Sequence, residues 1–202
     1  VYGMCKAISE RLVTSRAAEY SRVKFVSVRY GNVLESRGSI IPLFRHQAIN
    51  GKAFTLTHRE MTRFLMTLDD SIDLILNTAK NANTGETWVP KLKSMRILDL
   101  ANIFARRHHK PVEVIGMRPG EKLHEALLSD AESPRARDIG DHYILGAAFS
   151  DVDKNAKTFE YTSVDDVLSE EALEAYLSNI GIFEKSLDEF PGLHIEEIRT
   201  GG

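Results

Sequence analysis

Several features that would mark a special class of protein are scarce in this sequence. It holds a single cysteine, Cys5, which excludes an intramolecular disulfide and fits a reducing compartment. No apolar run is long enough to cross a membrane. A net charge of -3 over 202 residues argues against a nucleic-acid-binding protein that depends on bulk positive charge. We therefore expect a globular, cytoplasmic protein with no nucleic-acid partner and no membrane span in this chain.

Metal sites and nucleophilic triads also find no support in the sequence. The seven histidines show no metal-ligand spacing, and no Ser-His-Asp or Cys-His arrangement can be argued. The most basic stretch, residues 106–110, follows a helical pattern, and cations suit the C-terminal end of a helix dipole. We interpret this stretch as a helix end, and we expect no metal ion.

Helical and strand patterns alternate from end to end of the chain, which indicates an α/β fold. The spacing predicts helices over residues 1–20, 39–50, 69–80, 94–104, 121–128 and 169–180. It predicts strands over residues 24–30, 54–57, 63–67, 85–90 and 111–115. Residues 129–141 read as a charged loop, and residues 186–202 read as a flexible tail.

The first helical pattern carries a tyrosine and a lysine four residues apart, Tyr2 and Lys6. At that spacing the two side chains lie one turn apart on one face. A lysine ammonium near a phenol favours the phenolate, which can take a proton from a substrate hydroxyl. The spacing alone leaves open an exposed helix on which Lys6 is only a solvated charge.

A second pattern, residues 29–33, ends a predicted strand and is followed by Ser39 ahead of a predicted helix. Ligands of α/β proteins bind at the carboxyl ends of parallel strands. Asn32 can donate and accept hydrogen bonds there, and the helix start at Ser39 presents N–H groups suited to phosphate or carbonyl oxygens. The alternative is an asparagine in a tight turn and a capping serine.

Two arginines complete the candidate site residues. Arg63 has apolar neighbours at a strand start, and a guanidinium in such a place needs a partner, either a diphosphate or a neighbouring acid. Arg118 is followed by Pro119 and Gly120, which fix a tight turn at a predicted helix start. We expect Arg118 and Glu121 to converge there, as ligands for phosphate and sugar hydroxyls or as an ion pair that braces the turn.

In their order along the chain, these motifs resemble the extended short-chain dehydrogenases that act on nucleotide sugars. The motifs are Tyr-x-x-x-Lys at 2–6, Arg-Tyr-Gly-Asn-Val at 29–33, Ser-Arg-Gly-Ser at 36–39, Met-Thr-Arg-Phe at 61–64 and Arg-Pro-Gly-Glu-Lys-Leu-His-Glu at 118–125. Within that family the sequence is similar to the UDP-N-acetylglucosamine 4,6-dehydratases of polysaccharide biosynthesis. The resemblance implies the C-terminal part of a Rossmann-like fold, namely the last strands of the parallel sheet and a nucleotide-sugar-binding lobe.

The resemblance assigns three residues to chemistry and cofactor binding. Tyr2 matches the base that removes the sugar 4-hydroxyl proton. Lys6 matches the residue that binds the nicotinamide ribose and supports the tyrosine, and Tyr30 falls beside the nicotinamide. The implied cofactor is NADP, or NAD, tightly bound and recycled, with most of its site in an N-terminal half that precedes these motifs in the family.

The resemblance assigns five further residues to the UDP-sugar substrate. Asn32 matches a sugar-nucleotide contact, and Ser39 lies in the segment that holds the UDP moiety. Arg63 and Arg118 match diphosphate ligands, and Glu121 matches a ribose ligand. The implied reaction oxidises C4, eliminates water across C5 and C6, and reduces C6, which gives a 4-keto-6-deoxy sugar nucleotide, in several members with inversion at C5.

We expect residues 1–185 to form the C-terminal half of such an enzyme, with the catalytic helix at 1–20 and the UDP-sugar lobe mainly at 32–183. The isolated chain is expected to be inactive and the full-length protein to be a homo-oligomer. Glu35 stands where relatives carry a small residue, and we expect it to alter the sugar pocket. The alternatives are a nucleotide-sugar 4-epimerase, a non-catalytic UDP-sugar-binding module and a non-functional gene fragment.

Overall fold

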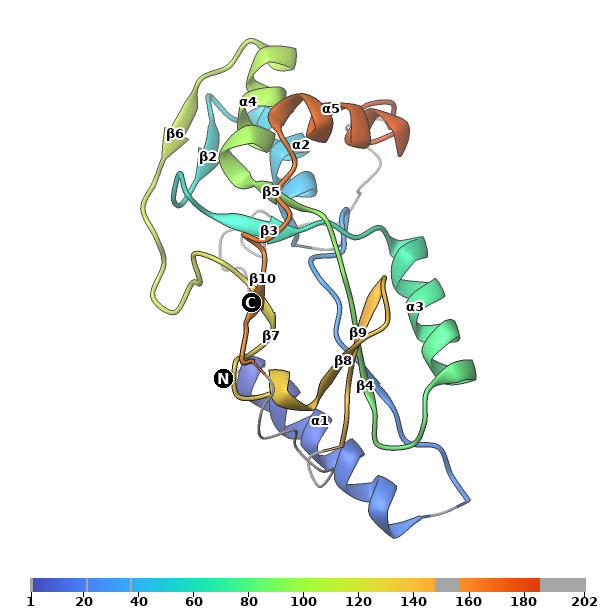
Figure 1. The fold of residues 1–202 in the computed structure, drawn as a ribbon. Helices are drawn as coiled ribbons and strands as arrows, with labels where there is room; N and C mark the ends of the chain where they lie inside the picture. Colours follow the sequence, from blue (N-terminus) through green and yellow to red (C-terminus); the bar gives the residue numbers. More distant parts are fainter. Residues whose placement is uncertain (1, 21, 37, 148–156, 186–202) are drawn as a thin grey trace. The chain divides into compact units, whose positions relative to one another are not determined.

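The computed structural model describes residues 2–20, 22–36, 38–147 and 157–185, without the side chain of Tyr2. The chain divides into two units that each combine three segments (Figure 1). Unit 1 takes residues up to 30, 69–91 and 126–162, and unit 2 takes residues 31–68, 92–125 and those from 163 onward. The boundary after Tyr30 divides the motif at 29–33 between the two units.

Unit 1 is organised around a four-stranded mixed sheet. Its strand order is β1-β4-β9-β8, formed by Ser27–Val28, Thr87–Pro90, His142–Leu145 and Ala136–Asp138. β1 is parallel to β4, whereas the other neighbours are antiparallel. A second, antiparallel pair joins β7 (Ala126–Leu128) to β10 (Tyr161–Thr162). The helices of this unit are α1 (Tyr2–Glu19), α3 (Leu68–Asn81) and the short 3-10 helix η1 (Ser133–Arg135).

Unit 2 packs three helices and two strand pairs around an aromatic core. The helices are α2 (Ile40–Asn50), α4 (Ile97–His108) and α5 (Glu170–Asn179). β2 (Phe54–Leu56) is parallel to β6 (Val112–Val114), and β3 (Thr62–Phe64) is antiparallel to β5 (Ser94–Arg96). The rings of Phe44, Phe54 and Phe104 lie 5.4 to 5.8 Å apart in edge-on or tilted contacts, which are favourable for aromatic pairs.

The α/β class and most predicted elements are confirmed. Helices form over Tyr2–Glu19, Ile40–Asn50, Leu68–Asn81 and Glu170–Asn179, close to their predicted bounds. The last of them has Ser169 at its N-cap, where the hydroxyl accepts from the Ala172 N–H. The predicted strand at 24–30 is shorter, because only Ser27–Val28 pairs with a neighbour in the described part of the chain. The predicted tail at 186–202 lies outside the described residues.

The predicted helix over 121–128 is wrong. The backbone of this segment bonds to distant residues, since the Leu123 carbonyl accepts from the Thr62 N–H and the Glu125 carbonyl accepts from the Ser163 N–H. Ala126–Leu128 then forms β7, in which Leu128 is fully buried. A short run of apolar residues does not distinguish a helix from a buried strand in the sequence. For this segment, tertiary contacts determine the secondary structure.

Two further predictions around this region need correction. Ser94 does not begin a helix, because it lies in β5 and its N–H donates to the Asp166 carbonyl at 2.8 Å, so that α4 begins at Ile97. The predicted loop over 129–141 contains η1 and β8. β8 pairs with β9 and carries exposed Arg137 and Asp138, so the apolar alternation that signals a strand is missing.

The basic stretch at 106–110 lies at the C-terminal end of α4, as expected. Arg106 pairs with Glu170 and Glu174 of α5, and Arg107 also pairs with Glu174. Lys110 reaches the end of α2, where its ammonium donates to the carbonyls of residues 47, 48 and 51 at 2.9, 2.5 and 2.8 Å. These cations therefore hold α4, α5 and α2 together.

Candidate functional site

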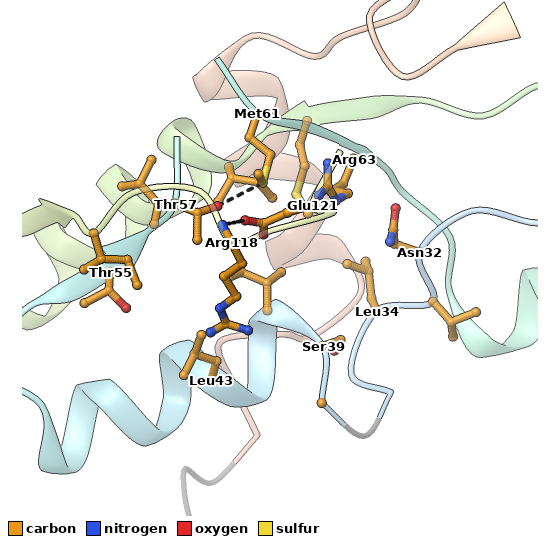
Figure 2. Close-up of a pocket in the computed structure, with 17 residues that line it drawn as sticks. Asn32, Leu34, Ser39, Leu43, Thr55, Thr57, Met61, Arg63, Arg118 and Glu121 are labelled. Carbon is orange, nitrogen blue, oxygen red and sulfur yellow. Dashed lines mark hydrogen bonds between the residues drawn. The ribbon is translucent and has the colours of Figure 1, made fainter. Parts of the chain in front are cut away.

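Unit 2 contains a cavity of about 250 Å³ that is lined by five of the residues singled out in the sequence. They are Asn32, Ser39, Arg63, Arg118 and Glu121 (Figure 2). Apolar side chains complete the lining, including Leu34, Leu43, Met61, Ile97 and Ile115. A mainly apolar cavity with a few convergent polar groups is the usual form of a small-molecule site.

Asn32 reaches the cavity from a loop whose path depends on a glycine. A Cβ built on Gly31 would lie 2.5 Å from the Cβ of Phe64 and 2.9 Å from a Leu92 methyl group. No side chain fits at that separation, so the close approach of this loop to β3 requires glycine. The loop then pairs with the chain after β3 through a parallel bridge between Val33 and Met66.

Ser39 occupies the N-cap of α2, as predicted, but its side chain makes no capping hydrogen bond. Its hydroxyl oxygen is buried, and among the described residues it has no hydrogen-bond partner. The first N–H groups of a helix also have no intrahelical acceptor. The cavity wall at Ser39 therefore offers a buried hydroxyl and a helix N-terminus, a combination suited to an anion.

Arg63 is held in place mainly by backbone carbonyl groups. Its Nη1 donates to the carbonyls of Thr62 and Leu123 at 2.7 and 3.2 Å, and its Nη2 donates to the Lys122 carbonyl at 2.9 Å. Glu125 lies 3.6 Å from Nε, so the acidic neighbour considered from the sequence is present. Burial lowers the pKa of Arg63, and the attraction of Glu125 and Glu121 offsets this only in part. Arg63 thus braces the segment at 118–125.

Arg118 and Glu121 lie on the tight turn predicted from Pro119 and Gly120. Gly120 has φ +80°, and the Glu121 N–H donates to the Arg118 carbonyl at 3.1 Å. The Glu121 carboxylate accepts from the backbone N–H of Arg118 at 3.1 Å, so it caps the turn (Figure 2). Both residues line the cavity, but the printed contact between them comes from the Arg118 backbone and not from its guanidinium, and no helix follows the turn.

A hydrogen-bonded cluster beside Arg63 was not predicted. The Thr62 hydroxyl lies 2.8 Å from Nδ1 of His124 and 2.6 Å from the Ser163 hydroxyl, and the latter accepts from the Glu125 N–H at 2.9 Å. His124 lies in the segment over 121–128 that was predicted to be a helix, and its ring contacts the Thr62 hydroxyl instead. The three residues come from motifs about 40 to 100 positions apart, and no local pattern reports such a contact.

Glu35 does not line the cavity, and its expected effect on the sugar pocket stays a prediction. It has φ +61°, and its carboxylate pairs with Arg45 at 2.6 Å and with Lys185. Arg45 is 2 % exposed and also donates to the Ile182 carbonyl at 2.8 Å. Glu35 therefore ties the loop before α2 to α2 itself and to the segment after α5.

Unit 1 carries the other three predicted residues. Tyr2 and Lys6 belong to α1, where Lys6 is exposed, and Tyr30 follows β1 with 45 % of its surface exposed. Cys5 is exposed on the same helix. The cofactor-binding roles of Lys6 and Tyr30 stay predictions.

The comparisons with known proteins place this α/β fold in the Rossmann-like, extended short-chain dehydrogenase class. Residues 1–147 match the family described as "Polysaccharide biosynthesis protein", and the chain belongs to that family. The X-ray structure of Pen from Bacillus thuringiensis superposes with a TM-score of 0.80 and 34% identity, over 90% of this chain and 58% of that one.

Three curated relatives carry different names. The chain is 35% identical to an uncharacterized membrane protein of Methanocaldococcus jannaschii, over 89% of this chain and 57% of that protein. It is 40% identical to the UDP-glucose 4-epimerase of Rickettsia canadensis, over 71% of this chain and 43% of that protein. It is 35% identical to the inverting UDP-N-acetylglucosamine 4,6-dehydratase of Campylobacter jejuni, over 77% of this chain and 47% of that protein. The chain spans about half the length of these relatives. In its described part, no helix is long and apolar enough to span a membrane.

Arg63 is expected to be irreplaceable by lysine. An ammonium carries the charge but cannot reach the three carbonyls that the guanidinium fork joins, so R63K should release the turn that carries Arg118 and Glu121. We expect amide hydrogen exchange of residues 118–125 in this chain to accelerate at least about 10-fold, as for loss of a hydrogen bond to a charged group. R59K, at an exposed position, is the matched control. Equal exchange rates of these amides in R63K and R59K would contradict the bracing role.

Proposed function

We propose that this chain is the substrate-binding part of a nucleotide-sugar-modifying enzyme, and that the complete protein is a UDP-N-acetylglucosamine 4,6-dehydratase. The observation that carries the proposal is the cavity of unit 2, which joins Arg63, Arg118, Glu121 and the N-terminus of α2 around one space. Two guanidinium groups and a helix N-terminus suit a diphosphate, and a carboxylate suits sugar hydroxyls. The relatives named as a dehydratase and an epimerase support a nucleotide-sugar substrate.

In the proposed reaction, residues of this chain bind the substrate and move its proton. Arg63 and Arg118 hold the diphosphate, Glu121 accepts from ribose hydroxyls, and Asn32 contacts the sugar. Tyr2 takes the proton of the 4-hydroxyl, with Lys6 stabilising the phenolate. NADP or NAD would act as hydride acceptor and donor when bound, and Lys6 and Tyr30 would contact its nicotinamide half.

A second candidate function is a nucleotide-sugar 4-epimerase. The 40% identity to an epimerase over 71% of the chain favours it. An epimerase needs the same Tyr2 proton transfer but no elimination of water, so the described residues of this chain serve both reactions. A non-catalytic UDP-sugar-binding module would use the cavity of unit 2 alone.

The test is to incubate the complete protein with UDP-N-acetylglucosamine and to identify the product by mass spectrometry and NMR. A product lighter by one water and carrying a 4-keto group supports the dehydratase. A product of unchanged mass with inverted C4 supports the epimerase instead. Binding without conversion would leave the binding module, and absence of UDP binding by this chain would contradict all three. We further propose that the complete protein acts as a homo-oligomer on cytoplasmic substrates.

A further inference from the structure

Arg29 of unit 1 is fully engaged by two carboxylates and a carbonyl. Its Nε and Nη2 donate to the two oxygens of Glu10 at 2.8 and 2.6 Å. Nη1 and Nη2 donate to the two oxygens of Glu132 at 2.9 and 2.6 Å, and Nη1 also donates to the Leu127 carbonyl at 2.9 Å. All five guanidinium N–H groups are used, in two bidentate pairs. The cluster joins α1, the chain just after β1 and the turn before η1.

The cluster is largely shielded from solvent and stays charged. The side chains of Arg29, Glu10 and Glu132 are 21 %, 23 % and 24 % exposed. Burial by itself would lower the pKa of Arg29, but its hydrogen bonds with Glu10 and Glu132 raise it above the ordinary value. The hydrogen bond from Arg29 lowers the pKa of Glu132 to about 2. Such pairs, desolvated and bidentate, hold geometry more firmly than exposed ion pairs do.

Glu10 connects this cluster to the helix face that carries the Tyr-Lys motif. Residues 2, 6 and 10 are spaced by four, so their Cα atoms lie along one side of α1. A glutamate four residues from a lysine on a helix is in position to form an ion pair with it. Both carboxylate oxygens of Glu10 accept hydrogen bonds from Arg29.

We propose that Arg29 is a positioning residue, which fixes α1 against β1 and holds the charge of Glu10 away from Lys6. The inference rests on the proposed function, because it concerns the proton transfer assigned to Tyr2. Without Arg29, α1 loses its anchor on the strand end and Glu10 can pair with Lys6. The ammonium of Lys6 then supports the phenolate less, and Tyr2 needs a higher pH to act as a base.

The test compares R29M, R29M/E10Q and R16M in the complete protein. R16M removes an exposed arginine of the same helix that pairs with Glu19, and it is the matched control. We expect kcat/KM of R29M to fall about 10²-fold, as for a small misplacement of a catalytic group. In the pH profile of kcat/KM, the acid limb of R29M should move to higher pH. In R29M/E10Q the acid limb should return toward its original position. An unmoved acid limb, or one that E10Q does not restore, would overturn the role in charge placement.

A measurement on this chain separates the inference from the proposed function. In R29M, the ¹³C titration midpoint of Glu132 should rise from about 2 toward its ordinary value of 4.5. Hydrogen exchange of the α1 amides should accelerate in R29M and stay unchanged in R16M. Unaltered α1 exchange in R29M would overturn the positioning role. If α1 exchange accelerates but the unsubstituted complete protein converts no nucleotide sugar, the proposed function fails while the structural role of Arg29 stands.

Discussion

Replacing Tyr2 by phenylalanine in the complete protein is expected to lower kcat by about 10²- to 10⁴-fold, the usual contribution of a positioned general base. The substitution removes the phenolic oxygen that would take the 4-hydroxyl proton and leaves the ring. The cavity proposed to bind UDP is lined by residues of unit 2, whereas the backbone of Tyr2 belongs to unit 1. The dissociation constant for UDP should therefore stay unchanged, so that the loss appears in kcat and not in binding.

The control for Tyr2 is a second tyrosine at the other end of the same region. Tyr20 follows α1 and is 51% exposed, and Y20F should leave kcat within about twofold because surface substitutions have small effects. Steady-state rates and UDP titrations of both variants provide the comparison. A Y2F enzyme with the kcat of Y20F would show that the Tyr-Lys spacing is an exposed helix pattern, the alternative that the sequence left open.

The second large effect is expected on stability, at the ion pair between Glu35 and Arg45. E35Q leaves the Arg45 guanidinium charged and 2 % exposed, with Lys185 no longer compensated beside it. Removing one partner of a buried pair costs about 3 to 5 kcal/mol. We expect the lower end, about 3 kcal/mol, because Arg45 keeps its hydrogen bond to the Ile182 carbonyl. Hydrogen exchange of the α2 and α4 amides measures this in unit 2.

Two further variants test the origin of that loss. E19Q removes the exposed partner of Arg16 and should cost less than about 1 kcal/mol. E35Q/R45M removes both charges and should recover much of the stability, since a buried pair can be replaced by apolar groups with little cost. A double variant as unstable as E35Q would show that Glu35 acts through its left-handed backbone position and not through its charge.

The same pair gives a pH dependence with a defined sign. Burial by itself would raise the pKa of Glu35, but its contacts with Lys185 and Arg45 lower it below 4.5. A carboxylate with a lowered pKa binds its proton less well in the folded state than in the unfolded state. The stability that it contributes is therefore present above pH 4.5 and is lost as the pH falls through the lowered value. In E35Q this part of the acid loss should be absent.

The sequence predicted the class of fold and the cavity residues because both depend on local patterns. Helical periodicity located α1, α2, α3 and α5, and loop motifs located Asn32, Ser39 and Glu121. What it missed depends on distant contacts. The conformation of the segment at 121–128 depends on backbone hydrogen bonds to Thr62 and Ser163. β8 carries charged side chains at a sheet edge. The hydrophobic periodicity of neither segment therefore matches the structure that it forms. The Tyr2 and Lys6 roles stay predictions.

The ammonium of Lys110 at the end of α2 has a consequence for ligand binding at the other end. A helix carries about half a positive charge at its N-terminus and half a negative charge at its C-terminus. Lys110 neutralises the negative end through the carbonyls of residues 47, 48 and 51. Toward the cavity at Ser39, α2 therefore acts as a partial monopole, whose field reaches farther than that of a dipole. Mobile counterions screen such a field, so binding of the proposed diphosphate ligand should slow as ionic strength rises.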